Sequence, residues 1–299
     1  MSSLIEHIDF SKLSESQRLF HGRGHAYPGF EHICIDWYEP LILITLYKEE
    51  SVDVVNTLAN QLMEKVPACK SVQVQHRWQA RAPFTLVLGD EVTSVEALES
   101  GLKYNISLGN AQNTGLFLDM KKGRDWVQAN SSGKNVLNLF SYTCAFSIAA
   151  HAGGANQIVN IDLSKASLSR GRDNHHLNKQ STDKVVFQGL DIFKSFGRIK
   201  KYGPYQLVII DPPSFQKGSV NIEKDYHKIV RRIPEFVSPG GHVMLCLNNP
   251  DLTDEFLTDM VTEYCPALTY REHIYPPEVF KEAQKGRGLK VMIFDYLPD

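Results

Sequence analysis

Three acidic residues each stand close behind a short apolar run of the sequence. Asp162 ends QIVNID, Asp191 closely follows KVVFQG, and Asp211 ends YQLVIID. A carboxylate after the second run can accept hydrogen bonds from both hydroxyls of a ribose, and one after the third run can accept from an adenine amino group. The alternative is that Asp162 and Asp191 only cap the helices that follow them. The turn beside these acids helps to decide between the two interpretations.

That turn follows the first apolar run, VLNLF. Residues 138–147 read NLFSYTCAFS, a polar, small-residue turn into a helix that contains no G-x-G-x-x-G. A dinucleotide fold places glycines there so that a pyrophosphate can approach the backbone at the helix N-terminus. NAD and FAD are therefore disfavoured. The turns after the first three apolar runs occupy equivalent positions at the strand ends. Together they indicate an adenosine-containing cofactor without a pyrophosphate, and S-adenosylmethionine fits that description.

The sequence Asp211-Pro212-Pro213-Ser214-Phe215 follows the fourth apolar run. Two prolines fix φ and keep the chain out of a helix, so the acid and the proline carbonyls are held rigidly at the strand end. A carbonyl can orient an amino group for attack, and the Phe215 ring can stack on a flat base. A mere strand exit would not explain an acid before the prolines and an aromatic residue after them. The sequence predicts a catalytic turn of Asp211, Pro212, Pro213 and Phe215.

The elements that must bring these turns together alternate regularly from about Leu137 onward. Short apolar runs alternate with amphipathic segments, as in a parallel sheet with helices on both faces. The runs span 136–140, 157–162, 184–189, 205–211 and 242–248, and the helical segments span 164–178, 223–237 and 251–265. Two further strands, in LTYREHIY and LKVMIFDYL, are joined by a loop too short for a crossover and should pair antiparallel. The predicted fold class is α/β, with a Rossmann-like sheet of seven strands, the last one antiparallel.

The first part of the chain has a different pattern. Residues 32–49 read as two strands around a turn at Glu39 and Pro40, 52–66 have helical apolar spacing, and 71–78 and 84–90 read as two more strands. This is a small α+β module, and nothing in it has the spacing of a catalytic motif. We predict an N-terminal recognition or scaffold domain over 1–110 and a cofactor-binding domain over 111–299.

Composition limits the remaining possibilities. The 299 residues are 42% hydrophobic and 22% charged, enough for a sizeable core, and the net charge of −2 excludes a globally basic nucleic-acid coat but not a local basic patch. Five scattered cysteines without C-x-x-C support neither a disulfide framework nor a zinc ribbon, so a reducing cytoplasm is expected. No export signal is expected at the N-terminus, and no apolar stretch approaches the ~18 residues of a membrane span.

The turns resemble those of a known family. The N-L-F-S-Y-T and D-P-P turns are similar to those of class I S-adenosylmethionine-dependent methyltransferases of the bacterial large-subunit rRNA type, closest to its guanine N7-methylating and cytosine C5-methylating members. Residues 114–124, TGLFLDMKKGR, resemble the T-G-x-F-x-D-x-R segment before that family's core, and 18–38 more loosely resemble the start of its central module. The resemblance is good over about 100–299 and implies methylation of large-subunit rRNA.

The resemblance also implies a cofactor pocket. Its residues would be Asp119, Lys121, Asn138, Phe140, Ser141, Tyr142, Thr143, Asp162, Leu163, Asp191, Ile192 and Asp211. Asp119 would lie near the methionine end, and Lys121 stands where an arginine commonly grips the methionine carboxylate. Lysine keeps the charge but lacks the bidentate fork. The family's turn continues with two small residues where this chain has Cys144 and Ala145.

The methylated atom is expected to be a nitrogen. Methylation of cytosine carbon-5 needs attack by a thiolate, expected in the D-P-P turn or at the end of the fifth strand. Those places hold Ser214 and Asn248-Asn249, whereas Cys246 lies inside the strand, where a buried packing role is expected. The paired asparagines are more like the guanine-methylating relatives. The sulfonium already activates the methyl group, and no metal site is predicted.

Basic residues cluster locally despite the balanced total. One cluster holds Lys200 and Lys201 in GRIKK, another holds Lys285 and Arg287 near the C-terminus, and HGRGH, 21–25, is a weaker third. We predict RNA contact by the first two clusters, with solvated loop charge as the alternative. The cofactor turns do not specify the acceptor, so cytosine carbon-5, a protein or a small molecule are alternatives. A non-catalytic RNA-binding module that keeps the fold is a further alternative. Nothing in the sequence indicates an oligomeric state.

Overall fold

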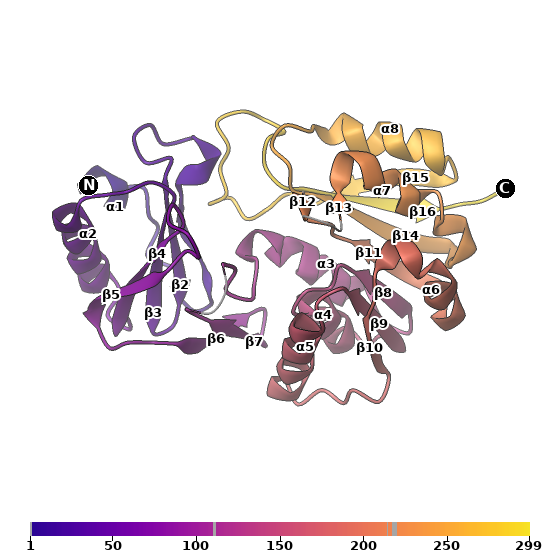
Figure 1. Cartoon of the computed structure of the whole chain (residues 1–299), viewed down its shortest axis with the longest axis horizontal. Helices are drawn as coiled ribbons and strands as arrows, with labels where there is room; N and C mark the ends of the chain where they lie inside the picture. The colour runs from indigo at the N-terminus through magenta and orange to yellow at the C-terminus, as the bar shows by residue number, and fades with distance from the viewer. Residues whose placement is uncertain (1, 110–111, 214, 217–219) are drawn as a thin grey trace. The chain divides into compact units, whose positions relative to one another are not determined.

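The computed structural model describes residues 2–109, 112–213, 215–216 and 220–299. The chain forms two compact units (Figure 1). Unit 1 comprises Met1–Asp119 and Pro277–Lys285, and unit 2 comprises Met120–Pro276 and Gly286–Asp299. None of the helices in these described ranges is long and apolar enough to cross a membrane.

Unit 2 is built on a seven-stranded sheet with the order β10-β9-β8-β11-β14-β16-β15. Neighbouring strands from β10 to β14 are parallel, and β16 runs antiparallel between β14 and β15. This confirms the predicted fold class and the reversed last strand. The strands are β8 (Asn135–Leu139), β9 (Gln157–Asp162), β10 (Val185–Gly189), β11 (Tyr205–Ile210), β14 (Val237–Leu247), β15 (Leu268–His273) and β16 (Lys290–Tyr296).

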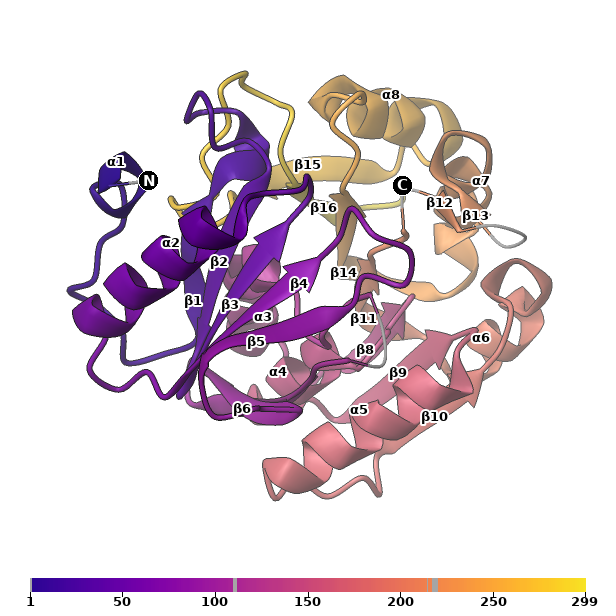
Figure 2. The same ribbon diagram turned by 60° about the vertical axis from the view of Figure 1, so that its left-hand side comes forward.

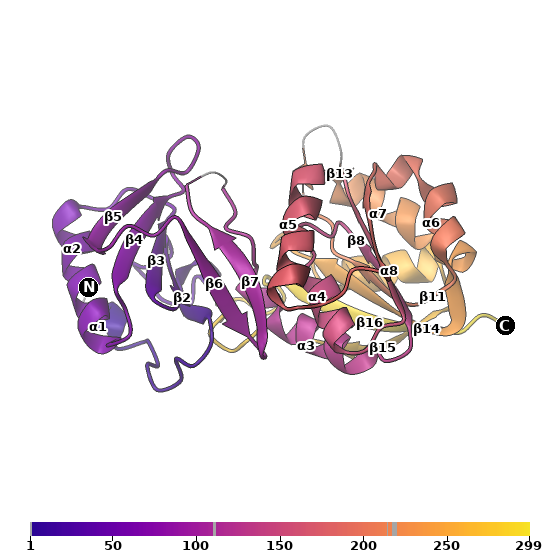
Figure 3. The ribbon, with the colours of Figure 1, turned by 90° about the horizontal axis from the view of Figure 1, so that it is seen from below.

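Helices cover both faces of this sheet (Figure 3). Their bounds are α3 (Lys121–Asn130), α4 (Ala145–Ala152), α5 (Lys165–Leu177), α6 (Phe196–Tyr202), α7 (Ile222–Val230) and α8 (Asp254–Tyr264). Side chains of α6, α7 and α8 join one apolar core cluster, and those of α3 and α4 join the other. Neighbouring residues of β8 point to opposite faces, Val136 into one cluster and Leu137 into the other, which is why the strands read as continuous apolar runs.

Two predicted elements have different bounds. The helix expected over 223–237 ends at Val230 and is followed by a short 3-10 turn, η4 (Ile233–Glu235). Pro234 stands in that turn, and proline is unfavourable inside an α-helix because it lacks the N–H donor and clashes with the preceding turn. The fifth strand begins at Val237 rather than 242.

Unit 1 holds a five-stranded sheet in the order β1-β2-β3-β4-β5, with all neighbours antiparallel except β3 and β4. Figure 2 shows α2 lying across this sheet. The expected order strand, strand, helix, strand, strand is present, and β1 and the β6-β7 hairpin were not predicted. The elements are α1 (Ser2–Ile5), β1 (Gln17–His21), β2 (Ile33–Tyr38), β3 (Leu41–Leu46), α2 (Val52–Lys65), β4 (Ser71–His76), β5 (Phe84–Gly89), β6 (Ser94–Glu99) and β7 (Leu102–Ser107).

The division of the chain differs from the predicted one. The predicted boundary, between 110 and 111, lies outside the described residues, and Pro277–Lys285 belongs to unit 1. In this segment the Ala283 N–H donates to the Gly24 carbonyl over 2.7 Å, and Glu282 forms a β-bridge with His25. A side chain at Gly24 would collide with the Lys281 carbonyl, so the HGRGH motif is shaped to receive this segment.

Candidate functional site

The predicted turns meet because the parallel strands end at one edge of the unit 2 sheet. Leu139 of β8 is aligned with Ile161 of β9 and with Ile210 of β11, and Asp162 is aligned with Gly189 of β10. The residues that follow these strands therefore start from neighbouring positions. The carboxyl edge carries the turn after β8, the acids after β9 and β10, and the D-P-P turn after β11.

The turn after β8 has an unusual backbone. Phe140, Tyr142 and Cys144 have positive φ angles of 57°, 46° and 61°. Such angles cost free energy for residues other than glycine and persist only where the surroundings hold them. Two hydrogen bonds stabilise this backbone conformation. The Ser141 N–H donates to the Ile161 carbonyl (3.1 Å), and the Tyr142 N–H donates to Asp162 Oδ2 (2.8 Å). Strand β9 therefore fixes the shape of the turn.

Asp162 lies at the centre of this edge. Its Oδ2 accepts the Tyr142 N–H, and its Oδ1 accepts the Ser164 N–H at 2.7 Å. The cap of α5 is Ser164, whose Oγ accepts the Ser167 N–H, so the capping alternative does not apply to Asp162. Each carboxylate oxygen can accept a second hydrogen bond, which leaves acceptor positions for two ribose hydroxyls.

Asp191 does cap the short helix η3 (Ile192–Lys194). Its carboxylate accepts the Phe193 N–H at 3.0 Å and lies 3.2 Å from the Lys194 ammonium. The predicted contact of Asp191 with the adenine amino group stays a prediction. The Ile192 side chain is buried in the apolar core, which leaves its backbone for the predicted contact with the cofactor, and that contact stays a prediction.

The residues at this edge fit the adenosine part of S-adenosylmethionine. Leu163, directly after Asp162, is 50% exposed although it is apolar, and the rings of Phe140 and Phe193 lie 6.3 Å apart. The buried Ser141 hydroxyl has no nitrogen or oxygen partner in the described part of the chain. No side chain caps the first turn of α4. Apolar surface, free carboxylate positions and an unused hydroxyl are what a base and a ribose require.

Asn138 does not face the edge as predicted. It is 1% exposed, and its Nδ2 donates to Asn160 Oδ1 at 2.9 Å. The chain of buried contacts continues from Asn160 to Ser147 (2.9 Å) and from Ser147 to His175 (2.8 Å). This correction follows from strand register, because Asn138 and Asn160 are aligned in β8 and β9 and satisfy each other. The network positions α4 and α5 behind the turn.

Thr143 is likewise a supporting residue. It is buried, and its carbonyl accepts the Asn174 side-chain amide of α5 at 3.1 Å. Gly171 of the same helix faces Cys144, whose sulfur fills the space that a side chain at Gly171 would need. Helix α5 therefore packs directly onto the turn. Neither contact has a sequence signal beyond the small residue at 171.

Helix α3 begins with Lys121, the residue expected to grip the methionine carboxylate. The Lys121 ammonium lies 3.1 Å from the carboxylate of Asp125, one turn further along α3. This ion pair partly neutralises the lysine charge. Asp119 lies directly before this helix, in η2 (Leu118–Met120), and is half-buried. Both predicted contacts with the cofactor stay predictions.

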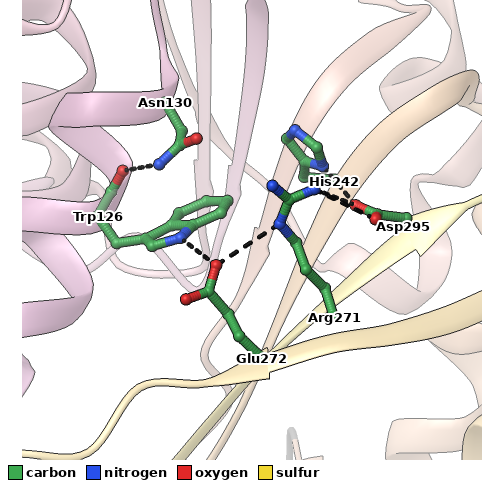
Figure 4. A network of polar contacts seen from close by, with 6 residues as sticks. All are labelled: Trp126, Asn130, His242, Arg271, Glu272 and Asp295. Carbon is green, nitrogen blue, oxygen red and sulfur yellow. Dashed lines mark hydrogen bonds and ion pairs between the residues drawn. The ribbon is translucent and has the colours of Figure 1, made fainter.

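A polar network attaches α3 to the sheet (Figure 4). Trp126 Nε1 donates to Glu272 Oε1 at 2.9 Å, and Glu272 lies 3.5 Å from Arg271. Arg271 pairs with Asp295 of β16 (3.2 Å), which also contacts His242 of β14 (2.7 Å). Three strands thus fix the helix that carries Lys121.

A residue that the sequence analysis did not identify holds the strand end before the D-P-P turn. Tyr226 of α7 is buried, and its hydroxyl lies 3.0 Å from the Ile210 carbonyl and 3.1 Å from the Cys246 carbonyl. It therefore ties the carboxyl ends of β11 and β14 together next to Asp211. Asp211 is half-buried, Pro212 buried and Pro213 exposed. Ser214 lies outside the described residues, and Phe215 is described only as the first residue of β12 (Phe215–Gln216).

The chain is similar to known proteins in sequence and fold. A family model described as S-adenosylmethionine-dependent methyltransferase matches residues 17–295. The chain belongs to the S-adenosylmethionine-dependent methyltransferase family. YwbD of Bacillus subtilis, which carries the name of a ribosomal RNA large subunit methyltransferase, is 28% identical over 95% of this chain and 76% of its own length. The solved structure of SMU.776, named as a methyltransferase and complexed with SAH, matches with a TM-score of 0.85 and 28% identity over 95% of this chain and 76% of that one.

A second relative has a different length. The ribosomal RNA large subunit methyltransferase K/L of Pseudoalteromonas translucida is 32% identical over 66% of this chain, which spans only 28% of that protein. The family fixes S-adenosylmethionine as the cofactor of this methyltransferase. The carboxyl edge of unit 2, with Asp162 at its centre, stays the predicted place for this cofactor.

The loop after β14, which carries the paired asparagines, is held by two basic residues. Lys290 of β16 is 1% exposed and donates from Nζ to the Asn249 carbonyl at 2.9 Å. Arg287 donates to the Pro250 carbonyl (3.2 Å) and pairs with Asp251 (3.0 Å). Arg287, predicted to bind RNA, therefore anchors this loop. Lys290 stands within the apolar run LKVMIF. A charged residue in such a run is the sequence signal that could have indicated a buried lysine with a structural role.

The other predicted RNA contacts are separated. Lys200 and Lys201 form the last turn of α6, which leads directly into the amino end of β11. They thus lie at the edge of the sheet opposite Asp211, and their predicted contact with RNA stays a prediction. Lys285 is exposed and belongs to unit 1.

Proposed function

We propose that this methyltransferase transfers a methyl group to a nucleobase nitrogen of large-subunit rRNA, in the cytoplasm and without a metal ion. The RNA class is supported by the names of YwbD and the K/L protein, which the chain resembles over 95% and 66% of its length. Among the described residues no cluster of His, Cys, Asp and Glu is arranged as a metal site.

One observation carries the choice of nitrogen over carbon. All five cysteines are buried, the most exposed being Cys69 at 7%. Cys246 lies in the apolar core beside the loop after β14, and burial raises the pKa of Cys144 to about 12. A thiolate that attacks cytosine must be ionised and reachable by the base. A nitrogen acceptor needs no such nucleophile.

The mechanism then rests on alignment. S-adenosylmethionine supplies an activated methyl group when bound, and the protein must place the acceptor nitrogen in line with it. Asp162 would hold the ribose, and the Asp211 carboxylate and the Pro212 carbonyl would orient the amino group of the base. The Tyr226 hydroxyl keeps these acceptors in place through the Ile210 carbonyl. Pro212 itself is buried.

The test compares rRNA nucleosides from cells with and without the gene by mass spectrometry. We expect the loss of one methylated purine or pyrimidine that carries the methyl group on nitrogen, and its restoration by the purified enzyme acting on rRNA from the deletion strain. RNA containing 5-fluorocytosine distinguishes the alternative, because only a thiolate mechanism traps it covalently. Covalent trapping, or efficient methylation of a protein or small molecule but not of RNA, would refute the proposal.

A further inference from the structure

Two arginines meet at one tyrosine on an edge of the unit 1 sheet. The Arg23 guanidinium lies 4.2 Å from the centre of the Tyr47 ring, and that of Arg77 lies 5.6 Å from it. Arg23 follows β1, Tyr47 follows β3 and Arg77 follows β4, so three strand ends supply the three residues. Neither arginine belongs to the carboxyl edge of unit 2 described above.

The backbone fixes these residues side by side. The Arg77 N–H donates to the carbonyl of Leu46, the residue before Tyr47, at 2.8 Å, and the Tyr47 N–H donates to the His32 carbonyl at 2.8 Å. Arg23 lies in η1 (Gly22–Gly24), which packs so closely that a side chain at Gly22 would collide with the Phe30 carbonyl. The arrangement is therefore built by the strand ends and does not depend on flexible side chains alone.

The two guanidinium charges are not neutralised by the protein. Across the described ranges neither Arg23 nor Arg77 forms an ion pair with a carboxylate, and the Arg77 guanidinium donates to the Gln112 carbonyl (2.8 Å) and the Asn113 side chain (3.3 Å), both uncharged. The nearby carboxylate of Glu50 is engaged by His32 at 3.2 Å and by the Ser51 N–H at 2.9 Å. Two like charges held against one ring attract an anion, and guanidinium groups match phosphate geometry.

An exposed aromatic residue follows Arg77 in the same loop. Trp78 directly follows Arg77 and is 39% exposed, with its ring packed edge-on against His76 at 6.2 Å. Lys48 and Arg81 are further exposed cations in the same two loops. Arginines without a carboxylate partner, on the same group of loops as an exposed indole, are a combination that can hold single-stranded RNA, because phosphates contact the charges while bases stack on the rings.

We propose that Arg23, Tyr47, Arg77 and Trp78 form a binding site for single-stranded RNA on unit 1. The proposal rests on the proposed function for the origin of that RNA, an unpaired segment of the rRNA substrate. The site would explain why a methyltransferase with a net charge of −2 can hold a polyanion. It also gives a role to Arg23 of the HGRGH motif, which no step of methyl transfer uses.

The experiment measures binding of a fluorescein-labelled oligouridylate of about 16 nucleotides to the full chain by anisotropy over a range of salt concentrations. Arg23→Ala should reduce the log-log salt slope by about 0.7, because one phosphate contact is lost. Trp78→Ala should weaken binding at least about fivefold with the salt slope unchanged. Arg23→Lys and Trp78→Phe should retain most of the binding. Lys65→Ala, which removes an exposed charge from the last turn of α2, is the matched control and should bind like the wild type.

The outcomes separate this site from the proposed function. Loss of oligouridylate binding in both alanine variants, with S-adenosylmethionine affinity retained in calorimetry, supports the site even if rRNA is not methylated. In that case only the proposed function fails. If the wild type methylates rRNA and both variants bind oligouridylate and methylate rRNA as the wild type does, the site is refuted and the proposed function stands. Absence of oligouridylate binding by the wild type also refutes the site.

Discussion

The sulfur of Cys144 occupies the space that a side chain at Gly171 would fill. Cys144 has a φ of 61° at the start of α4, and the resemblance places a small residue at its position in related turns. Helix α5 can therefore approach the cofactor turn only because residue 171 has no side chain. We therefore expect the effects of substitutions at positions 144 and 171 on stability to depend on each other.

Gly171→Ala should destabilise the protein by about 1 to 3 kcal/mol, because the added methyl group overpacks a buried contact. Adding Cys144→Gly should recover most of this loss, because it removes the sulfur and relieves the positive φ. Urea unfolding of the wild type, both single variants and the double variant measures the coupling. Gly197→Ala in α6 is the control, since its methyl group would meet nothing within 4 Å and should be neutral or slightly stabilising. Strict additivity of the two changes would contradict the pairing.

Asp162→Ala should weaken S-adenosylmethionine binding at least tenfold, because each lost hydrogen bond to the carboxylate is worth roughly 1.5 to 3 kcal/mol. The substitution also removes the acceptor of the Tyr142 N–H, so unfolding is measured together with calorimetric affinity. Asp173→Ala, which removes an exposed acid from α5, is the matched control. Unchanged affinity in the Asp162 variant would remove this residue from the site.

Tyr226→Phe should reduce methyl transfer while S-adenosylmethionine affinity stays near the wild-type value. The hydroxyl links the Ile210 and Cys246 carbonyls, and its loss should cost about 1 kcal/mol of stability and loosen the turn that presents Asp211. Tyr205→Phe is a close control, because Tyr205 lies at the amino end of β11 and its hydroxyl donates to the Ile199 carbonyl at 2.9 Å. Equal losses of activity in the two variants would show that only stability matters.

The carboxyl edge could be predicted because its signals are local. An apolar run followed by an acid, as at Asp162 and Asp211, marks both a strand and its exit toward a ligand. The role of Asn138 could not be read in this way, since it depends on the register that places Asn160 beside it. The edge on which Lys200 lies could likewise not be read from its charge, because it follows from the direction of the chain.

Long-range contacts account for the other differences. The attachment of Pro277–Lys285 to unit 1 depends on the fit between Gly24 and the Lys281 carbonyl, two positions far apart in sequence. Strand β1 was missed because QRLFH has no period-two apolar pattern, and its Arg18 side chain is satisfied by Asp36 of β2. A charged residue that forms an ion pair with a neighbouring strand cannot be recognised as part of a strand until the pairing of the two strands is known.

The buried network behind the turn should make stability depend on pH. Burial, together with the smaller effect of the neighbouring His151, lowers the pKa of His175 from 6.5 to about 4. In the unfolded chain this histidine takes up a proton below about pH 6.5, whereas the folded protein does so only near pH 4. The unfolded state therefore binds more protons in this window, so stability falls as the pH drops from 6.5 to 4, by about 3 kcal/mol in total.

Urea unfolding at several pH values between 4 and 7 measures this loss. The glutamine in His175→Gln cannot titrate, so the stability of this variant should fall less steeply than that of the wild type across the same window. Burial also lowers the pKa values of His76 and His242, which are present in both proteins. The difference between the two curves therefore measures the contribution of His175 alone. The exposed neighbour His176→Gln should follow the wild-type curve. Parallel curves for the wild type and the His175 variant would mean that His175 ionises alike in the folded and unfolded states. The contact between its Nε2 and the Ser147 hydroxyl would then not require a neutral ring.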